Sequence, residues 1–260
     1  MTIRTIFILF SPLFLLAQEM PLASGSARVL EGDIYNVSCF VSGQNENWTY
    51  EEKLEILEKA KEGNDWLKSK AREFGTEFSF QNGNIGLSED VKLSTIERST
   101  ASGTERDDWV YLILKQIGYE NPLDYYNWVI QNTTCSQLQF IIYVKGNGTG
   151  YALPFSENLN REKYFIEGVI LYEKYWNGRK LASASIAHET LHLYGAWDFY
   201  KTHAQTTANE IRARKLFPNS IMLRTSFNIN SLEIDELTAH LIGWRKEYKN
   251  WYSSFMPSDY

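Results

Sequence analysis

One stretch constrains this chain more than any other: residues 188–198 read HETLHLYGAWD. His188 and His192 are four residues apart, which on an α-helix is about 400° of rotation, so both imidazoles leave nearly the same face one turn apart. Two imidazoles placed in this way can bind one metal ion at a Zn–N distance of about 2.0–2.1 Å. Glu189 lies about 100° round the helix from His188 and can address a metal-bound water instead of the metal. The stretch therefore predicts a helix that carries a catalytic zinc ion.

The third metal ligand is expected to be Asp198. Catalytic zinc usually has three protein ligands and one open position, and a helix that continued past His192 would carry the chain away from the metal. Gly195 can adopt the positive φ that turns the backbone sharply after a helix. The chain then returns with Asp198, six residues after His192. A carboxylate oxygen is an acceptable zinc ligand at about 2.0–2.2 Å.

Two other residues compete with Asp198 for the third position. Glu210 resembles the distal glutamate that a second helix supplies in thermolysin-like enzymes, although the aminopeptidase spacing would fall on Ile211, which cannot bind a metal. His203 is the other rival, and its spacing matches no known pattern. We expect His203 and His240 to be surface or packing histidines.

Residues 188–198 resemble the metzincin zinc-binding pattern HExxHxxGxxH, with Asp198 in place of the third histidine, as in snapalysin-type secreted bacterial proteases. Residues 220–222 (Ser-Ile-Met) are similar to the metzincin Met-turn, which places a methionine beneath the metal. Residues 235–244 resemble the helix that follows this turn. The resemblance covers residues 182–244. It implies an α/β fold with a twisted mixed sheet packed with helices, an active-site helix, and a small C-terminal subdomain with a Met-turn and a terminal helix.

The chain also departs from the metzincin pattern. Many family members carry a tyrosine two residues after the methionine of the turn, near the metal, and here that position is Arg224. The cysteine-switch propeptide of matrix metalloproteases is not visible. Two cysteines are too few for the venom or astacin-type subfamilies. An exported enzyme of the bacterial type fits these features better.

The motif and the resemblance together predict a secreted zinc-dependent endopeptidase. Glu189 would act as the general base on a metal-activated water, and a protein or peptide substrate would lie along an exposed sheet edge. Tyr151 to Leu153 is the candidate edge strand. Two alternatives stay open: a thermolysin-like or aminopeptidase-like zinc peptidase that uses Glu210, and a non-catalytic binding or effector protein on a protease fold. A monomer is expected.

The N-terminus predicts export. Residues 1–17 contain one positive charge followed by an apolar run that is too short to span a bilayer, which is typical of a signal peptide. A cut after Ala27 and an uncleaved anchor are the alternatives. An extracellular or periplasmic protein can pair Cys39 with Cys135 in a disulfide. Two free buried thiols, or a Cys39 thiolate that blocks the metal site in a latent form, are the alternatives. Removing residues 1–17 takes the net charge from −6 to −7, and such an acidic chain is not expected to bind nucleic acid or, after cleavage, a membrane.

The rest of the chain is expected to consist of a loosely ordered segment, residues 18–47, and a catalytic domain, residues 48–260. The domain is divided into an N-terminal subdomain, 48–195, and a C-terminal subdomain, 196–260. Thr49 and Glu52 have the spacing of a helix-capping box. Hydrophobic periodicity predicts helices over 49–62, 65–74, 107–117, 123–130, 181–194 and 234–251, and strands over 77–80, 138–144, 151–153 and 165–172. Alternating helices and strands favour a layered α/β domain.

Overall fold

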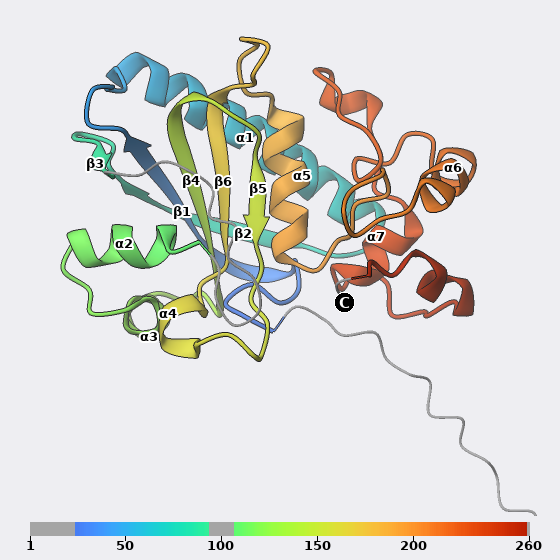
Figure 1. Ribbon diagram of the computed structural model, residues 1–260. Coiled ribbons are helices and arrows are strands. Elements are labelled where there is room, and N and C mark those ends of the chain that lie inside the picture. The colour runs from blue at the N-terminus through green and yellow to red at the C-terminus, as the bar shows by residue number, and fades with distance from the viewer. Residues whose placement is uncertain (1–23, 94–106, 259–260) are drawn as a thin grey trace, which may run out of the picture.

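The computed structural model describes residues 24–93 and 107–258 as a mixed α/β fold around a six-stranded sheet (Figure 1). The strand order is β2-β1-β4-β6-β5, and the short strand β3 also pairs with β1. Every pairing is parallel except that of β5, which runs antiparallel to β6 at one edge. The predicted α/β class with a mixed sheet is confirmed, whereas the predicted signal peptide lies outside the described residues. The strands are β1 (Gly32–Ser42), β2 (Phe78–Ile85), β3 (Val91–Lys92), β4 (Gln137–Asn147), β5 (Tyr151–Leu153) and β6 (Gly168–Lys174).

Helices cover both faces of the sheet (Figure 1). On β4, Ile141 and Tyr143 pack into the core under α1 and α5, whereas Phe140 and Ile142 pack into the core under α2 and α3. Alternation of this kind follows from the two-residue period of a strand, and burial on both faces explains the unbroken apolar run. No helix in the described ranges is long and apolar enough to cross a membrane. The helices are α1 (Tyr50–Glu73), α2 (Trp109–Gln116), α3 (Pro122–Asn132), α4 (Arg161–Tyr164), α5 (Ser183–Leu193), α6 (Thr207–Leu216) and α7 (Glu236–Leu241), with 3-10 helices η1 (Ile229–Ser231) and η2 (Asn250–Phe255).

Helix α1 is continuous, so the predicted break at Gly63-Asn64 is wrong. The capping box of Thr49 and Glu52 is present at its start, as expected. Gly63 does not end the helix because it lies at the contact with α5, where a Cβ would come 2.9 Å from the carbonyl oxygen of Ser183. The glycine allows the two helices to approach closely.

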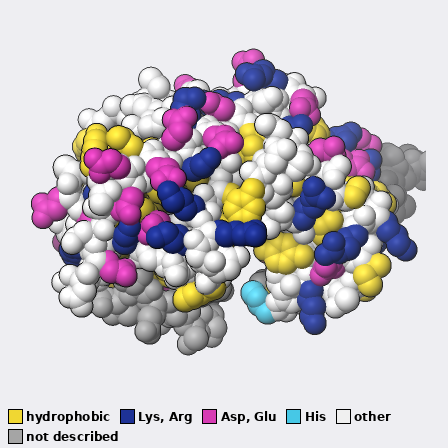
Figure 2. Space-filling model, turned by 90° about the horizontal axis from the view of Figure 1, so that it is seen from above, with side chains coloured by type: hydrophobic (Ala, Val, Ile, Leu, Met, Phe, Trp, Pro, Cys, Tyr) yellow, Lys and Arg dark blue, Asp and Glu magenta, His cyan; other side chains and the backbone are white. Residues whose placement is uncertain are grey.

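Acidic and basic side chains alternate along the exposed face of α1. Pairs three or four residues apart are neighbours on a helix surface and stabilise it weakly. Figure 2 shows acidic and basic side chains intermingled over the face seen from above, without a broad patch of one sign. The ion pairs of α1 are Lys59–Glu62, Lys61–Asp65 and Lys70–Glu73.

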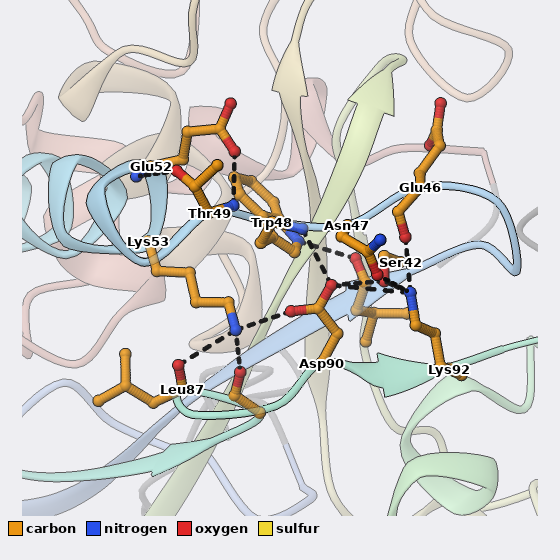
Figure 3. A network of polar contacts seen from close by, with 12 residues as sticks. Ser42, Glu46, Asn47, Trp48, Thr49, Glu52, Lys53, Leu87, Asp90 and Lys92 are labelled. Carbon is orange, nitrogen blue, oxygen red and sulfur yellow. Dashed lines mark hydrogen bonds and ion pairs between the residues drawn. The ribbon is translucent and has the colours of Figure 1, made fainter.

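A buried ion pair joins α1 to the loop that follows β2 (Figure 3). The Lys53 ammonium lies 2.7 Å from Oδ1 of Asp90 and donates to the carbonyl oxygen of Gly86 at 2.6 Å. The other oxygen of Asp90 accepts from the Ser42 hydroxyl and from the Trp48 backbone N–H. Burial alone would raise the pKa of Asp90, but Lys53 and these donors outweigh it and lower that pKa. Both members of this buried ion pair thus have further hydrogen-bond partners, as burial requires.

Residues 18–47 were expected to be loosely ordered, and this prediction is wrong for their described part, because strand β1 lies inside the sheet between β2 and β4. Polar and apolar residues do not alternate regularly in β1, so the sequence pattern does not predict this strand. Asn36 is buried in β1, where its side chain donates to Asn82 of β2 and accepts from Gln139 of β4. Polar residues that are satisfied across neighbouring strands break the apolar alternation on which strand prediction depends.

Residues 24–31 come directly before β1. We call this segment the N-terminal strap. Its Ser26 N–H donates to the carbonyl oxygen of Phe165, and its Ala27 N–H donates to the buried carboxylate of Glu167. At its other end the Leu30 carbonyl accepts from the indole of Trp244 at 2.7 Å. The strap therefore connects the sheet to the chain that follows α5.

The predicted long helix over 234–251 is also wrong. Helix α7 ends at Leu241, and Gly243 follows with φ 90°. The N–H groups of Gly243 and Trp244 donate back to the carbonyls of His240 and Ala239, which closes the helix end. The described residues after α5 contribute helices and loops but no strand to the sheet.

The predicted disulfide between Cys39 and Cys135 is absent, and both cysteines are buried free thiols. Cys39 pairs with Ile142 across β1 and β4, whereas Cys135 comes just before Gln137, the partner of Ile34. The register separates the two cysteines by about seven strand positions, or ~23 Å at ~3.3 Å per residue. A disulfide needs Cα atoms within about 7 Å.

Candidate metal centre

Helix α5 brings the two predicted histidine ligands together. The Nε2 atoms of His188 and His192 lie 3.2 Å apart, and their side chains are 5% and 17% exposed. His188 and His192 are one turn apart on the same helix face, as their spacing predicts.

Asp198 joins the two imidazoles through the bend at Gly195. Gly195 has φ 93°, and its N–H donates to the carbonyl of His192, while the Ala196 N–H donates to that of Leu191. These bonds end the helix and turn the chain back. Oδ1 of Asp198 then lies 3.3 Å from Nε2 of His188 and 3.2 Å from Nε2 of His192.

Backbone carbonyls determine which nitrogen of each imidazole carries the proton. Nδ1 of His188 lies 2.9 Å from the carbonyl oxygen of Ile221, and Nδ1 of His192 lies 2.8 Å from that of Ala196. A carbonyl only accepts, so each Nδ1 is the donor, and in the neutral ring Nε2 presents a lone pair. Two lone pairs and the buried Oδ1 of Asp198, which accepts no hydrogen bond in the described chain, thus converge on one point.

Such a triangle of acceptors fits a zinc ion. The three atom pairs are 3.2, 3.2 and 3.3 Å apart. Tetrahedral ligands at about 2.0–2.1 Å from zinc are separated by about 3.3–3.4 Å. Hydrogen-bonded imidazoles with free Nε2 atoms are also the form in which histidine binds metals. His188, His192 and Asp198 are therefore suited to hold zinc.

The electrostatics of the site favour positive charge at the same point. Burial disfavours the protonated form of His192, but the Asp198 carboxylate outweighs burial and raises the pKa of His192 to about 9. The pKa of His188 is raised in the same way, against its burial. In return, the two imidazoles hold the pKa of Asp198 well below its usual range despite burial. Without a metal, the site therefore retains a proton in neutral solution.

Glu189 lies on α5, as the two histidines do, and it lines a cleft next to them. Ligand atoms of His188, Glu189 and His192 lie within 4.8 Å of one another. The cleft is lined by β5 residues on one side and by residues 196–205 on the other. A Cβ on Gly150 would lie 3.6 Å from Oε1 of Glu189, so the missing side chain leaves the carboxylate open to the cleft. A group in this place can exchange protons with a molecule bound there.

A turn at residues 220–224 contacts the site through the carbonyl of Ile221. The N–H groups of Leu223 and Arg224 donate to the Ser220 carbonyl, and Met222 is fully buried. The Ser220 hydroxyl donates to Asp235, the N-cap of α7, at 2.6 Å. The turn therefore fixes the carbonyl of Ile221 that orients His188.

Glu210, the first rival ligand, is engaged elsewhere. Glu210 is on α6, where one carboxylate oxygen accepts from the Lys201 N–H and the other from the Arg214 guanidinium. His203 is exposed and lines the cleft. His240 packs against the rings of Tyr248 and Tyr252, as expected of a packing histidine.

Tyr200 is a site residue that the sequence analysis missed. Its ring stacks against that of His188 with centroids 6.2 Å apart, and it lines the cleft. Burial, followed by the charges of Asp198 and Glu189, raises the pKa of Tyr200 well above its usual range. Its position two residues after the third ligand was the only available signal, whereas the pattern directed attention to Arg224.

Comparison with models of protein families, with curated proteins and with solved structures found no match to this chain.

Proposed function

We propose that this chain is a secreted zinc-dependent endopeptidase of the metzincin type, with His188, His192 and Asp198 as metal ligands. One observation carries the proposal: the Nε2 atoms of His188 and His192 and Oδ1 of Asp198 converge in a triangle of the size that zinc requires. The turn over residues 220–224, whose Ile221 carbonyl contacts His188, is consistent with the resemblance.

Zinc bound there supplies Lewis-acid activation of water, whose pKa it lowers towards ~7. Glu189 would be the general base of the site, taking up a proton in the cleft and returning it to the leaving amine, because its carboxylate is open to the cleft beside the histidines. Tyr200 stays protonated and lines the cleft beside His188 and Asp198.

The substrate is an extended segment of a protein or peptide. Strand β5 is the last strand of the sheet and pairs only with β6 among the described strands. Its residues Tyr151 and Ala152 line the cleft together with Glu189, so a peptide bound there passes the general base.

The test compares the wild type with Glu189→Ala. We expect both proteins to bind one zinc ion after chelator treatment and zinc titration. In a peptide-library digest the wild type should cleave, a chelator should abolish cleavage, and Glu189→Ala should be slower by at least ~10²-fold.

Two outcomes would count against the proposal. A zinc-loaded Glu189→Ala protein with full activity would remove Glu189 from the role of general base. A wild type that binds zinc but cleaves no peptide would favour a non-catalytic binding protein.

A further inference from the structure

The third metal ligand differs from the two histidines because a loop presents it. His188 and His192 are held by α5, whereas Asp198 lies between α5 and α6. Its position therefore depends on contacts of the loop backbone, and two of these contacts act on a single peptide unit.

That peptide unit joins Asp198 to Phe199. Its N–H, which belongs to Phe199, donates to the carbonyl of Met222 at 2.8 Å. Its carbonyl, which belongs to Asp198, accepts from Nε2 of Gln205 at 3.1 Å. A peptide unit is planar, so contacts at both of its polar ends fix its orientation. The Cα atom of Asp198, from which the ligand side chain leaves, is thereby held in place.

The side-chain amide of Gln205 is buried, and both its nitrogen and its oxygen make hydrogen bonds. It is 4% exposed, and its Nε2 also donates to the carbonyl of Phe255 at 2.9 Å. Its Oε1 accepts from Nδ2 of Asn209 at 2.7 Å and from the N–H of Thr206 at 3.2 Å. A buried amide whose donors and acceptor are all engaged cannot rotate without losing hydrogen bonds.

The end of the chain completes this support. Phe255, in η2, packs against Phe199 with ring centroids 5.6 Å apart. The Ser258 N–H donates to the carbonyl of Ala204, and Pro257 lines the same cleft as Asp198. The last residues of the described chain thus lie directly against the loop that presents the ligand.

We propose that Gln205 is a positioning residue that couples the C-terminal segment, residues 250–258, to the third metal ligand. This inference rests on the proposed function, because it takes Asp198 to be a ligand. Loss of the Gln205 amide would leave Asp198 in place in the sequence but free to turn away from the histidines.

The chain supplies a matched control in Gln137. This glutamine is also 4% exposed, and its Nε2 donates to the carbonyls of Val29 and Glu31. Its Oε1 accepts from the N–H groups of Arg28 and Val29. Gln137 therefore makes the same four-bond clamp, but on the N-terminal strap instead of the metal loop.

The experiment compares Gln205→Met with Gln137→Met in the full chain. Methionine has nearly the same length but no hydrogen-bonding amide, so both variants should unfold at a lower temperature. Zinc affinity is measured by competition with a chromophoric chelator, and the visible spectrum of the Co²⁺-loaded protein reports the geometry of the ligands. We expect Gln205→Met to weaken zinc binding by ~10-fold or more and to change the cobalt spectrum. Gln137→Met should leave both unchanged.

If the methionine variant of Gln205 does not fold, Gln205→Asn replaces it, with Gln137→Asn as its control. Asparagine keeps the amide but is one methylene too short to reach both carbonyls. Equal zinc affinities and cobalt spectra for the Gln205 and Gln137 variants would overturn the role of Gln205. A wild type that binds no zinc would instead overturn the proposed function.

Discussion

At the scale of single residues, the position of the proton on each imidazole determines what the site can bind. Carbonyls of Ile221 and Ala196 hold the Nδ1 atoms of the two histidines, so both Nε2 atoms face Asp198 as acceptors. The two Nε2 lone pairs and the Asp198 carboxylate repel one another unless a cation or a proton lies between them. In the metal-free protein a proton has this role, and the pKa of His192 is raised for that reason.

The metal-free protein should therefore lose stability as the pH rises from about 6.5 to about 9. The folded pKa of His192 is about 9, whereas an unfolded histidine titrates near ~6.5. Between these values the folded state binds more protons than the unfolded state, so the free energy of unfolding falls with increasing pH. The melting temperature of chelator-treated protein, measured between pH 6 and 10, checks this.

The variant Asp198→Asn is the control for this prediction, because it removes the carboxylate that raises the pKa of His192. Its melting temperature should depend less on pH over the same window, and its zinc affinity should be lower. Identical pH profiles for the wild type and Asp198→Asn would contradict the assignment.

At the scale of elements, the close contact between α1 and α5 matters most for the site. Helix α5 carries both histidines, and it approaches α1 at Gly63, where a Cβ would lie 2.9 Å from the Ser183 carbonyl. Glycine usually weakens a helix interior. Here it is favoured by packing, and a prediction from local propensity alone therefore places a helix break where the helix continues.

Gly63→Ala should destabilise the protein by about 1–3 kcal/mol, although alanine favours helix formation, because backbone at the start of α5 must move. Chemical denaturation measures this difference. Ser69→Ala, at an exposed position of the same helix, should have no effect or a slight stabilising one. An equal or higher stability for Gly63→Ala would show that α5 can shift without cost.

At the scale of the whole molecule, both ends of the described chain are tied into the fold, but only the C-terminal end lies against the site. The N-terminal strap bonds to Phe165 and Glu167 under the sheet and to Trp244 after α7. The C-terminal segment packs against the loop of Asp198. Neither end has an amphipathic pattern that would reveal these contacts from the sequence.

A chain that begins at Arg28, the alternative cleavage product, should be less stable than one that begins at Gln18. It lacks the hydrogen bonds of Ser26 to Phe165, Leu138 and the N–H of Glu167, and that of Ala27 to the buried carboxylate of Glu167. At about 1 kcal/mol for each, with more for the charged acceptor, the loss is about 4 kcal/mol. Urea denaturation measures it.

The control for this truncation is a chain that begins at Ser24, which keeps the whole strap. It should match the chain that begins at Gln18. The same denaturation midpoint for all three chains would show that residues 24–27 do not contribute to stability.

The sequence by itself determined the features that depend on neighbours along the chain. His188 and His192 share one helix face because four residues make about one turn, the Gly195 bend needs only a positive φ, and the Thr49 capping box spans three residues. These follow from backbone geometry and can be predicted from spacing alone.

Only the tertiary structure decided the features that depend on contacts between distant residues. Strand β1 is stabilised by partners near Asn82 and Gln139, the helix at Gly63 by packing on α5, and the orientation of Asp198 by Gln205 and the C-terminal segment. Each of these pairings is a choice among many possible partners. Local spacing cannot make that choice, because the free energy that selects one partner comes from burial and hydrogen bonding in the complete fold.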